Sequence, residues 1–143
     1  MTVQSGPVVN AIAMVSLARH AALVAAHQPI PPPVPIHALI DTGASCTCVD
    51  PSVLTSLQLS PTGPCMMNTP SSGATPHATQ QYDMRLVIPG PSPMHPTLDL
   101  RNIPVASAEI LIHQGFHALI GRDILRHCMF TYNGSMGLFT LAY

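Results

Sequence analysis

Apolar runs are short along most of this chain, and proline, glycine or polar residues separate them. The clearest alternation covers residues 81–88, where apolar side chains occupy positions 82, 84, 86 and 88, and charged ones positions 83 and 85. A period of two predicts a β-strand with one buried face. Sixteen prolines argue against long helices. We therefore expect an all-β chain of short strands.

Other apolar runs end at turn signals and predict further strands. These are Val34–Ile40, Cys46–Val49, Leu98–Val105, Glu109–Ile112 and Ala118–Ile120. Asp50 followed by Pro51 predicts the capped start of a helical turn over 52–57, and 123–128 reads as a second short helix. Residues 129–141 predict a hairpin, in which Asn133 and Gly134 would supply the positive φ angles of the turn.

Composition limits the classes of partner. Charged residues make up 8% of the 143 positions, lysine is absent, and the net charge is −1. These values give no electrostatic case for a nucleic-acid or membrane partner. A surface with so few charges is consistent with association into a dimer. Residues 11–26 are too short, and too interrupted by Arg19 and His20, to span a bilayer, so a cytoplasmic protein is expected.

Cysteine and histidine do not form a recognisable ligand pattern. No pair among Cys46, Cys48, Cys65 and Cys128 has C-x-x-C spacing, and the eight histidines include no H-E-x-x-H. Free thiols in a reducing compartment are the expectation. The alternative is a redox or metal site at Cys46 and Cys48, whose side chains would share one face of a strand.

The most specific pattern is Ile40-Asp41-Thr42-Gly43-Ala44-Ser45, directly after an apolar run. It places one carboxylate on a tight glycine turn at the end of a buried strand. A second apolar pair closed by glycine follows as Leu119-Ile120-Gly121, with Arg122 next. Together these segments resemble the retropepsin-like aspartic proteases, the family of the retroviral proteases and their bacterial relatives. The resemblance covers roughly residues 35–139.

The resemblance implies a closed β-barrel or sandwich, with one short helix after Gly121, in a single lobe that dimerises. Asp41 would be the catalytic acid. Because the chain has only one such loop, the second carboxylate would come from another copy of the chain. Two close carboxylates share a proton, so one can activate a water while the other donates to the substrate carbonyl. Peptide or protein would be the substrate, and no metal or other cofactor is needed.

The resemblance also assigns supporting roles. Thr42 would hydrogen-bond across the dimer, Gly43 would permit the turn, Ala44 would leave room for substrate, and Ser45 would hydrogen-bond nearby. Leu119, Ile120 and Gly121 would pack beneath the loop. In retroviral proteases the arginine matching Arg122 pairs with an acid, but Ser45 stands at the acid's position here, which leaves Asp123 or Asp50 as candidates. A flap over roughly 68–79 would have its tip at Ser71, Ser72, Gly73 and Ala74.

Residues 31–143 are expected to form the protease domain, and residues 1–30 an N-terminal extension able to contribute the first strand. Ala, Leu and Met in 8–26 favour a helix, whereas 23–26 would fit a strand in the family's scheme. The sequence therefore predicts an aspartic endopeptidase active as a homodimer. Two alternatives stay open: a non-catalytic dimeric peptide-binding or scaffold module on the same fold, and a redox sensor using Cys46 and Cys48.

Overall fold

The computed structural model describes residues 6–67, 77–110 and 112–143. Within them the strands are β1 (Val8–Val15), β2 (Val34–Ile40), β3 (Cys48–Val49), β4 (Gly63–Met67), β5 (His77–Ile88), β6 (Leu98–Ser107), β7 (Ala118–Ile120), β8 (Met129–Asn133) and β9 (Leu138–Ala142). The helices are α1 (Leu17–Ala25), α2 (Pro51–Ser56) and α3 (Arg122–Leu125), with a 3-10 turn, η1, at Ile112–Gln114. The expectation of an all-β chain is confirmed.

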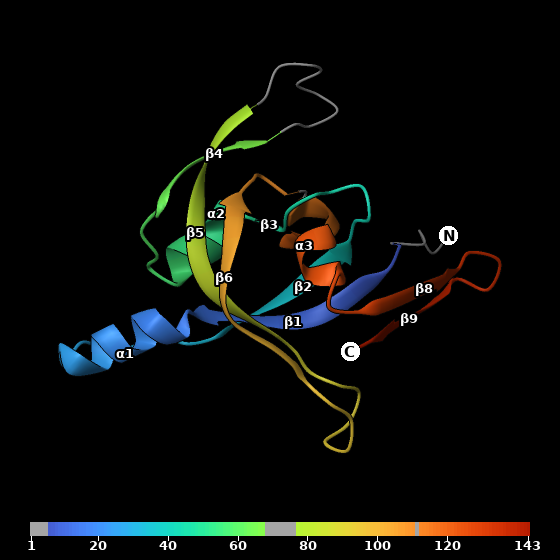
Figure 1. Cartoon of the computed structure of the whole chain (residues 1–143), viewed down its shortest axis with the longest axis horizontal. Coiled ribbons are helices and arrows are strands. Elements are labelled where there is room, and N and C mark those ends of the chain that lie inside the picture. The colour runs from blue at the N-terminus through green and yellow to red at the C-terminus, as the bar shows by residue number, and fades with distance from the viewer. Residues whose placement is uncertain (1–5, 68–76, 111) are drawn as a thin grey trace.

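Six strands close into a mixed barrel (Figure 1). Around the ring, β1 pairs with β2, β2 with β7, β7 with β3, β3 with β6, β6 with β5, and β5 again with β1. The β2–β7 and β3–β6 pairs are parallel, and the other pairs are antiparallel. β4 extends the sheet beyond β5. The expected barrel is therefore present, and its first strand comes from the segment before residue 30.

The barrel interior is filled by alternate side chains of the strands, as the period-two pattern predicts. Met84, Leu86 and Ile88 of β5 are all buried, and so are Ala11, Ala13 and Val15 of β1. α2 covers one end of this core with Val53, Leu54 and Leu57, while α3 contributes Ile124. The small alanines of β1, β2 and β7 allow the strands to approach closely around a narrow interior.

Residues 8–26 are the segment over which composition and the family's scheme disagreed. Residues 17–25 are helical, so the alternative of a strand at 23–26 is wrong. The helix that composition favours is wrong for residues 8–15, which form β1. Ser16 caps the helix by accepting a hydrogen bond from the Arg19 N–H, which is the kind of start signal that favours helix. α1 buries none of its residues and projects away from the barrel (Figure 1).

Two further expectations need correction. Residues 108–110 are irregular and 112–114 form η1, so no strand runs over 109–112 in the described residues. The β8–β9 hairpin is present, but the positive φ angle lies at Gly137 rather than at the Asn133–Gly134 pair. The Asn133 side chain instead accepts hydrogen bonds from Ser135 and Met136, which stabilises a longer loop.

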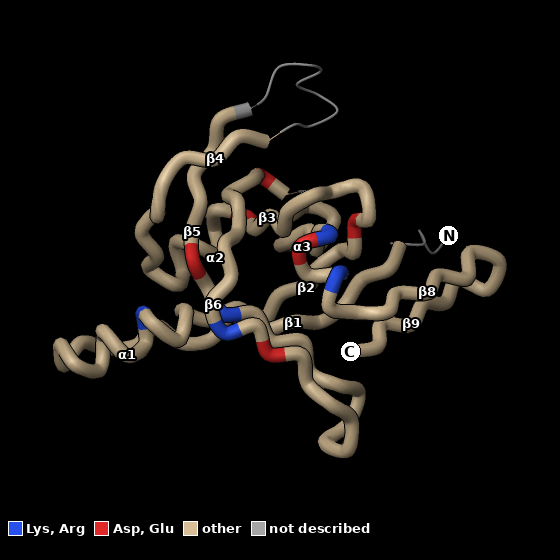
Figure 2. Tube along the Cα trace, in the orientation of Figure 1, with Lys and Arg blue, Asp and Glu red and all other residues tan. Residues whose placement is uncertain are grey.

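Charged residues are few along the trace, and acidic and basic positions are intermixed (Figure 2). Among the described residues, Asp99 of β6 forms ion pairs with Arg85 of β5 and with Arg101 of β6. No helix of the described chain is long and apolar enough to cross a membrane.

Candidate active site

Asp41 lies directly after β2, on a turn fixed by backbone hydrogen bonds. Its N–H donates to the Ile120 carbonyl of β7 (3.0 Å), which continues the parallel β2–β7 pairing by one residue. The Asp41 carboxylate accepts a hydrogen bond from the Gly43 N–H at 2.9 Å, and the Asp41 carbonyl accepts from Ala44. The side chain is half-buried. The sequence therefore places one oriented carboxylate at the end of a barrel strand.

Gly43 is needed for this arrangement because space beside the carboxylate is limited. A Cβ atom at position 43 would lie 3.2 Å from Asp41 Oδ1. That separation is tighter than almost all real Cβ contacts, so a larger residue would press on the acid. Thr42, Gly43 and Ser45 are exposed, and Ala44 is half-buried. The predicted loop residues are thus brought together at the surface around Asp41.

The end of β7 packs beneath the loop, as expected for Leu119, Ile120 and Gly121. Ile120 is fully buried in the core. A Cβ atom at Gly121 would lie 2.6 Å from the carbonyl carbon and oxygen of Cys46 and 3.1 Å from the Ala44 oxygen. The φ angle of Gly121 is −92°, which any residue can adopt, so this glycine is required by close backbone approach rather than by conformation.

Thr47 and Asp123 form a brace that the sequence did not single out. The fully buried Thr47 hydroxyl donates to Asp123 (2.8 Å) and accepts from the Gly121 N–H (3.1 Å). Asp123 also accepts from the N–H groups of Thr47 (3.0 Å) and Ile124 (2.9 Å). The only sign of this role in the sequence was that Asp123 is an acid in the first turn of a predicted helix, where a carboxylate is stabilising. With both oxygens engaged, Asp123 serves structure rather than water activation.

Arg122 contacts the Asp41 loop without an acidic partner. Its guanidinium donates to the Thr42 carbonyl (2.9 Å), and its backbone N–H donates to the Ala44 carbonyl (2.9 Å). The alternative of an ion pair with Asp123 or Asp50 is wrong among the described residues. Asp50 is instead occupied as the α2 cap, accepting from Ser52 (2.9 Å) and Ile110 (3.2 Å). Arg122 therefore secures the loop through its backbone carbonyls.

A pocket of about 330 Å³ opens beside this loop. It is lined by residues of the loop, of β3 and β4, and by one arginine: Gly43, Ala44, Ser45, Cys46, Cys48, Met66, Met67 and Arg122. β4 thus contributes Met66 and Met67 to the lining, together with residues of the loop that carries Asp41. The arrangement provides a sulfur-rich space with both polar and apolar walls, beside the loop that carries an oriented carboxylate. The predicted flap tip, Ser71, Ser72, Gly73 and Ala74, lies outside the described residues.

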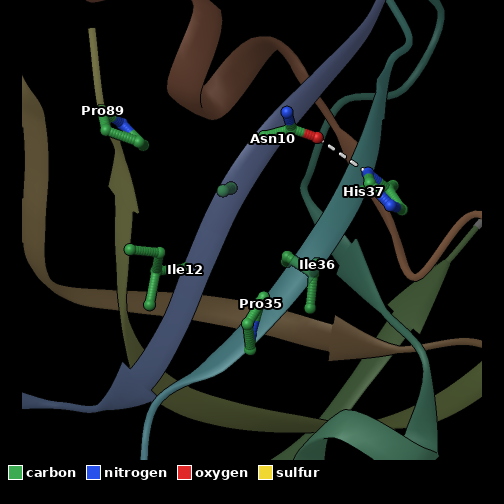
Figure 3. Close-up of a pocket in the computed structure, with 7 residues that line it drawn as sticks. Asn10, Ile12, Pro35, Ile36, His37 and Pro89 are labelled. Atoms are coloured by element: carbon green, nitrogen blue, oxygen red, sulfur yellow. Dashed lines mark hydrogen bonds between the residues drawn. The ribbon is translucent and has the colours of Figure 1, made fainter. Parts of the chain in front are cut away.

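A second pocket of about 260 Å³ lies across β1 and β2 (Figure 3). Its lining is mostly apolar and includes Ile12, Pro35 and Pro89. The polar side chains are Asn10 and His37, which hydrogen-bond to each other at 2.8 Å. None of its lining residues belongs to the Asp41 loop, so this pocket is not part of the candidate site for acid–base chemistry.

The Cys48 thiol near the loop is poorly suited to redox sensing. Burial, followed by the neighbouring Cys46, raises the pKa of Cys48 from 9.0 to about 12. A thiol held protonated in this way is a weak nucleophile at neutral pH. No three side chains of His, Cys, Asp or Glu in the described residues are grouped so as to hold a metal ion.

No protein-family model and no curated protein sequence matches the chain. Among solved structures, the chain is similar to the retroviral protease-like domain of Ddi1 from Leishmania major. The sequence identity is 12% and the TM-score is 0.41, over 79% of this chain and 82% of that chain. A likeness at this level does not assign a function, so the description of the site rests on the barrel topology and the loop geometry alone.

Proposed function

We propose that this chain is an aspartic endopeptidase of the retropepsin-like type, active as a homodimer. The observation that carries the proposal is the Asp41 carboxylate, half-buried after a barrel strand and oriented by the Gly43 N–H. The Asp-Thr-Gly sequence, the glycine packed beneath the loop and the adjacent pocket support the same conclusion. The substrate would be an extended peptide with one side chain in that pocket.

The proposed chemistry needs two Asp41 carboxylates, one from each subunit. Two acids held together share one proton because both cannot ionise cheaply. The ionised carboxylate would take a proton from the attacking water, and the protonated one would donate to the carbonyl oxygen. The Gly43 N–H bond would hold each carboxylate in the required orientation. Asp123 cannot supply the second acid within one chain because Thr47 and Ile124 already occupy it.

The β8–β9 hairpin supports association of two copies. It forms a sheet of its own, and isolated two-stranded hairpins are marginally stable in water. One of its faces packs toward the barrel through Leu141. Its other face exposes large apolar side chains, with 71% of Met129 and 56% of Leu138 accessible. A second subunit against this face would bury an apolar surface that one chain leaves in water.

The test is cleavage of an unfolded protein substrate by the wild-type chain and by Asp41→Asn. The variant should lose cleavage and keep its fold and assembly, because the amide preserves shape and removes only the charge. Asp83→Asn is a matched control, since Asp83 is an exposed carboxylate on β5 away from the loop. Pepstatin should inhibit the wild type. Cleavage retained by purified Asp41→Asn would refute the proposal.

The same measurements separate the non-catalytic alternative. A peptide-binding module would bind unfolded peptides without cleaving them, and binding would survive in Asp41→Asn. Binding by the wild type, with no cleavage across a broad range of pH and peptide sequences, would favour that module over the peptidase. A strictly monomeric chain at working concentrations would remove the second acid and exclude the peptidase mechanism.

A further inference from the structure

The wall of the pocket beside the Asp41 loop gathers sulfur atoms from two separate parts of the chain. Cys46 and Cys48 come from the loop and β3, and Met67 comes from β4. Cys48 Sγ lies 4.0 Å from Met67 Sδ and 3.8 Å from the Cys46 carbonyl oxygen. Cys46 lines the same pocket as Cys48 and Met67. Strand pairing around the barrel therefore brings two thiols and a thioether to one place.

The sulfur–sulfur distance matches that of two ligands on one metal ion. Metal–thiolate bonds are about 2.3 Å long, so two sulfurs at about 120° around one ion are about 4.0 Å apart. Thiolate and thioether together are ligands that select soft, monovalent copper over zinc or harder cations. The described residues hold no metal-binding group of three His, Cys, Asp or Glu side chains, but this set is different because its third member is a methionine.

We propose that Cys46, Cys48 and Met67 form a binding site for one Cu(I) ion per chain. Binding releases the two thiol protons to solvent, and the ion with two thiolates carries one net negative charge. Arg122 lines the same pocket and provides a positive charge to balance it. The site shares the pocket proposed for a substrate side chain, but copper binding can be measured whether or not the chain is a peptidase.

The experiment is anaerobic titration of the reduced full chain with Cu(I), using the chromophoric chelator bicinchoninate as competitor. We expect the wild type to remove one equivalent of Cu(I) per chain from the chelator. Cys46→Ser should abolish stoichiometric binding, and Met67→Leu should weaken it at least ~10-fold. Matched controls are Cys128→Ser and Met94→Leu, because Cys128 lies after α3 and Met94 is 93% exposed in the β5–β6 loop. X-ray absorption should show three sulfur neighbours at about 2.3 Å.

Three results would overturn the proposal. The first is a wild-type chain that leaves Cu(I) on the chelator. The second is Met67→Leu binding as tightly as the wild type, which would remove the thioether from the ligand set. The third is Cys128→Ser losing affinity as much as Cys46→Ser, which would indicate non-specific thiol binding. If Cys46→Ser fails to fold by circular dichroism, Met67→Leu decides alone, since it keeps the size and apolar character of the side chain.

Discussion

Gly121→Ala should destabilise the chain because the added methyl group has no room. The Cβ atom would lie 2.6 Å from two backbone atoms of Cys46, whereas ordinary contact begins at 3.4 Å. Neither atom belongs to a flexible side chain, so the loop or β7 must shift. Overpacking of this kind costs about 1–3 kcal/mol. A shift would also weaken the bonds from the Gly121 N–H to Thr47 and from the Arg122 N–H to Ala44, at about 1 kcal/mol each.

We therefore expect the free energy of unfolding to fall by about 2–4 kcal/mol, and Tm by roughly 6–20 °C. Urea denaturation and thermal scans would measure both values. Gly63→Ala is the control, because a Cβ atom at Gly63 would meet nothing within 4 Å. Its stability should change by no more than about 0.5 kcal/mol. Equal stability of the two variants would refute the inference that Gly121 is fixed by close packing beneath the Asp41 loop.

Three further predictions concern assembly and pH. Specific activity should fall on dilution because the single carboxylate per chain requires two copies; activity that stays constant in a range shown to be monomeric by sedimentation would contradict the shared site. Asp50→Ala should cost about 1–3 kcal/mol at pH 7, measured by urea denaturation, since it leaves the Ser52 and Ile110 N–H groups without their acceptor. Burial alone would raise the pKa of Asp50, but hydrogen bonds from Ser52 and Ile110 lower it. The stabilisation by Asp50 is therefore complete above the unfolded pKa of roughly 3.9 and is lost as pH falls through the lower folded pKa. A difference in unfolding free energy between wild type and Asp50→Ala that persists unchanged in strong acid would exclude this linkage. Cleavage should show a bell-shaped pH profile, because the shared proton must be present but only once, and a profile without an acidic limb would count against the carboxylate pair.

Local signals in the sequence predicted the parts of the fold that depend on neighbouring residues. The alternation over 81–88 gave the buried face of β5, and Asp50 with Pro51 gave the start of α2. The division of residues 8–26 into β1 and α1 could not be predicted, because an apolar segment rich in Ala and Leu fits either a helix or a buried strand. Ser16 is a cap only if the chain turns there. The 109–112 segment has strand-like composition, but the irregular backbone places the Ile110 N–H against Asp50, a contact that no local pattern encodes.

In the candidate site too, some residues could be predicted from the sequence and others could not. Asp41, Gly43 and Gly121 could be read from the sequence because tight turns and close backbone approach restrict residue type strongly. Thr47 could not, because its role depends on Asp123, which is far away in the chain and meets it only after β7 pairs with β3. The partner of Arg122 was also beyond sequence reasoning, since a backbone carbonyl leaves no trace in residue identity.

The position of β1 in the barrel sets an order of events during synthesis. β1 leaves the ribosome before the other strands of the barrel, yet one of its two neighbours is β5, with Ile12 opposite Val87. Before residues 84–87 emerge, β1 can pair only with β2, and its other edge presents unpaired backbone groups to any strand nearby. Such distant pairing is slow because the intervening chain must be ordered first. The growing chain is therefore most exposed to association with other unfinished chains between the appearance of β2 and that of β5.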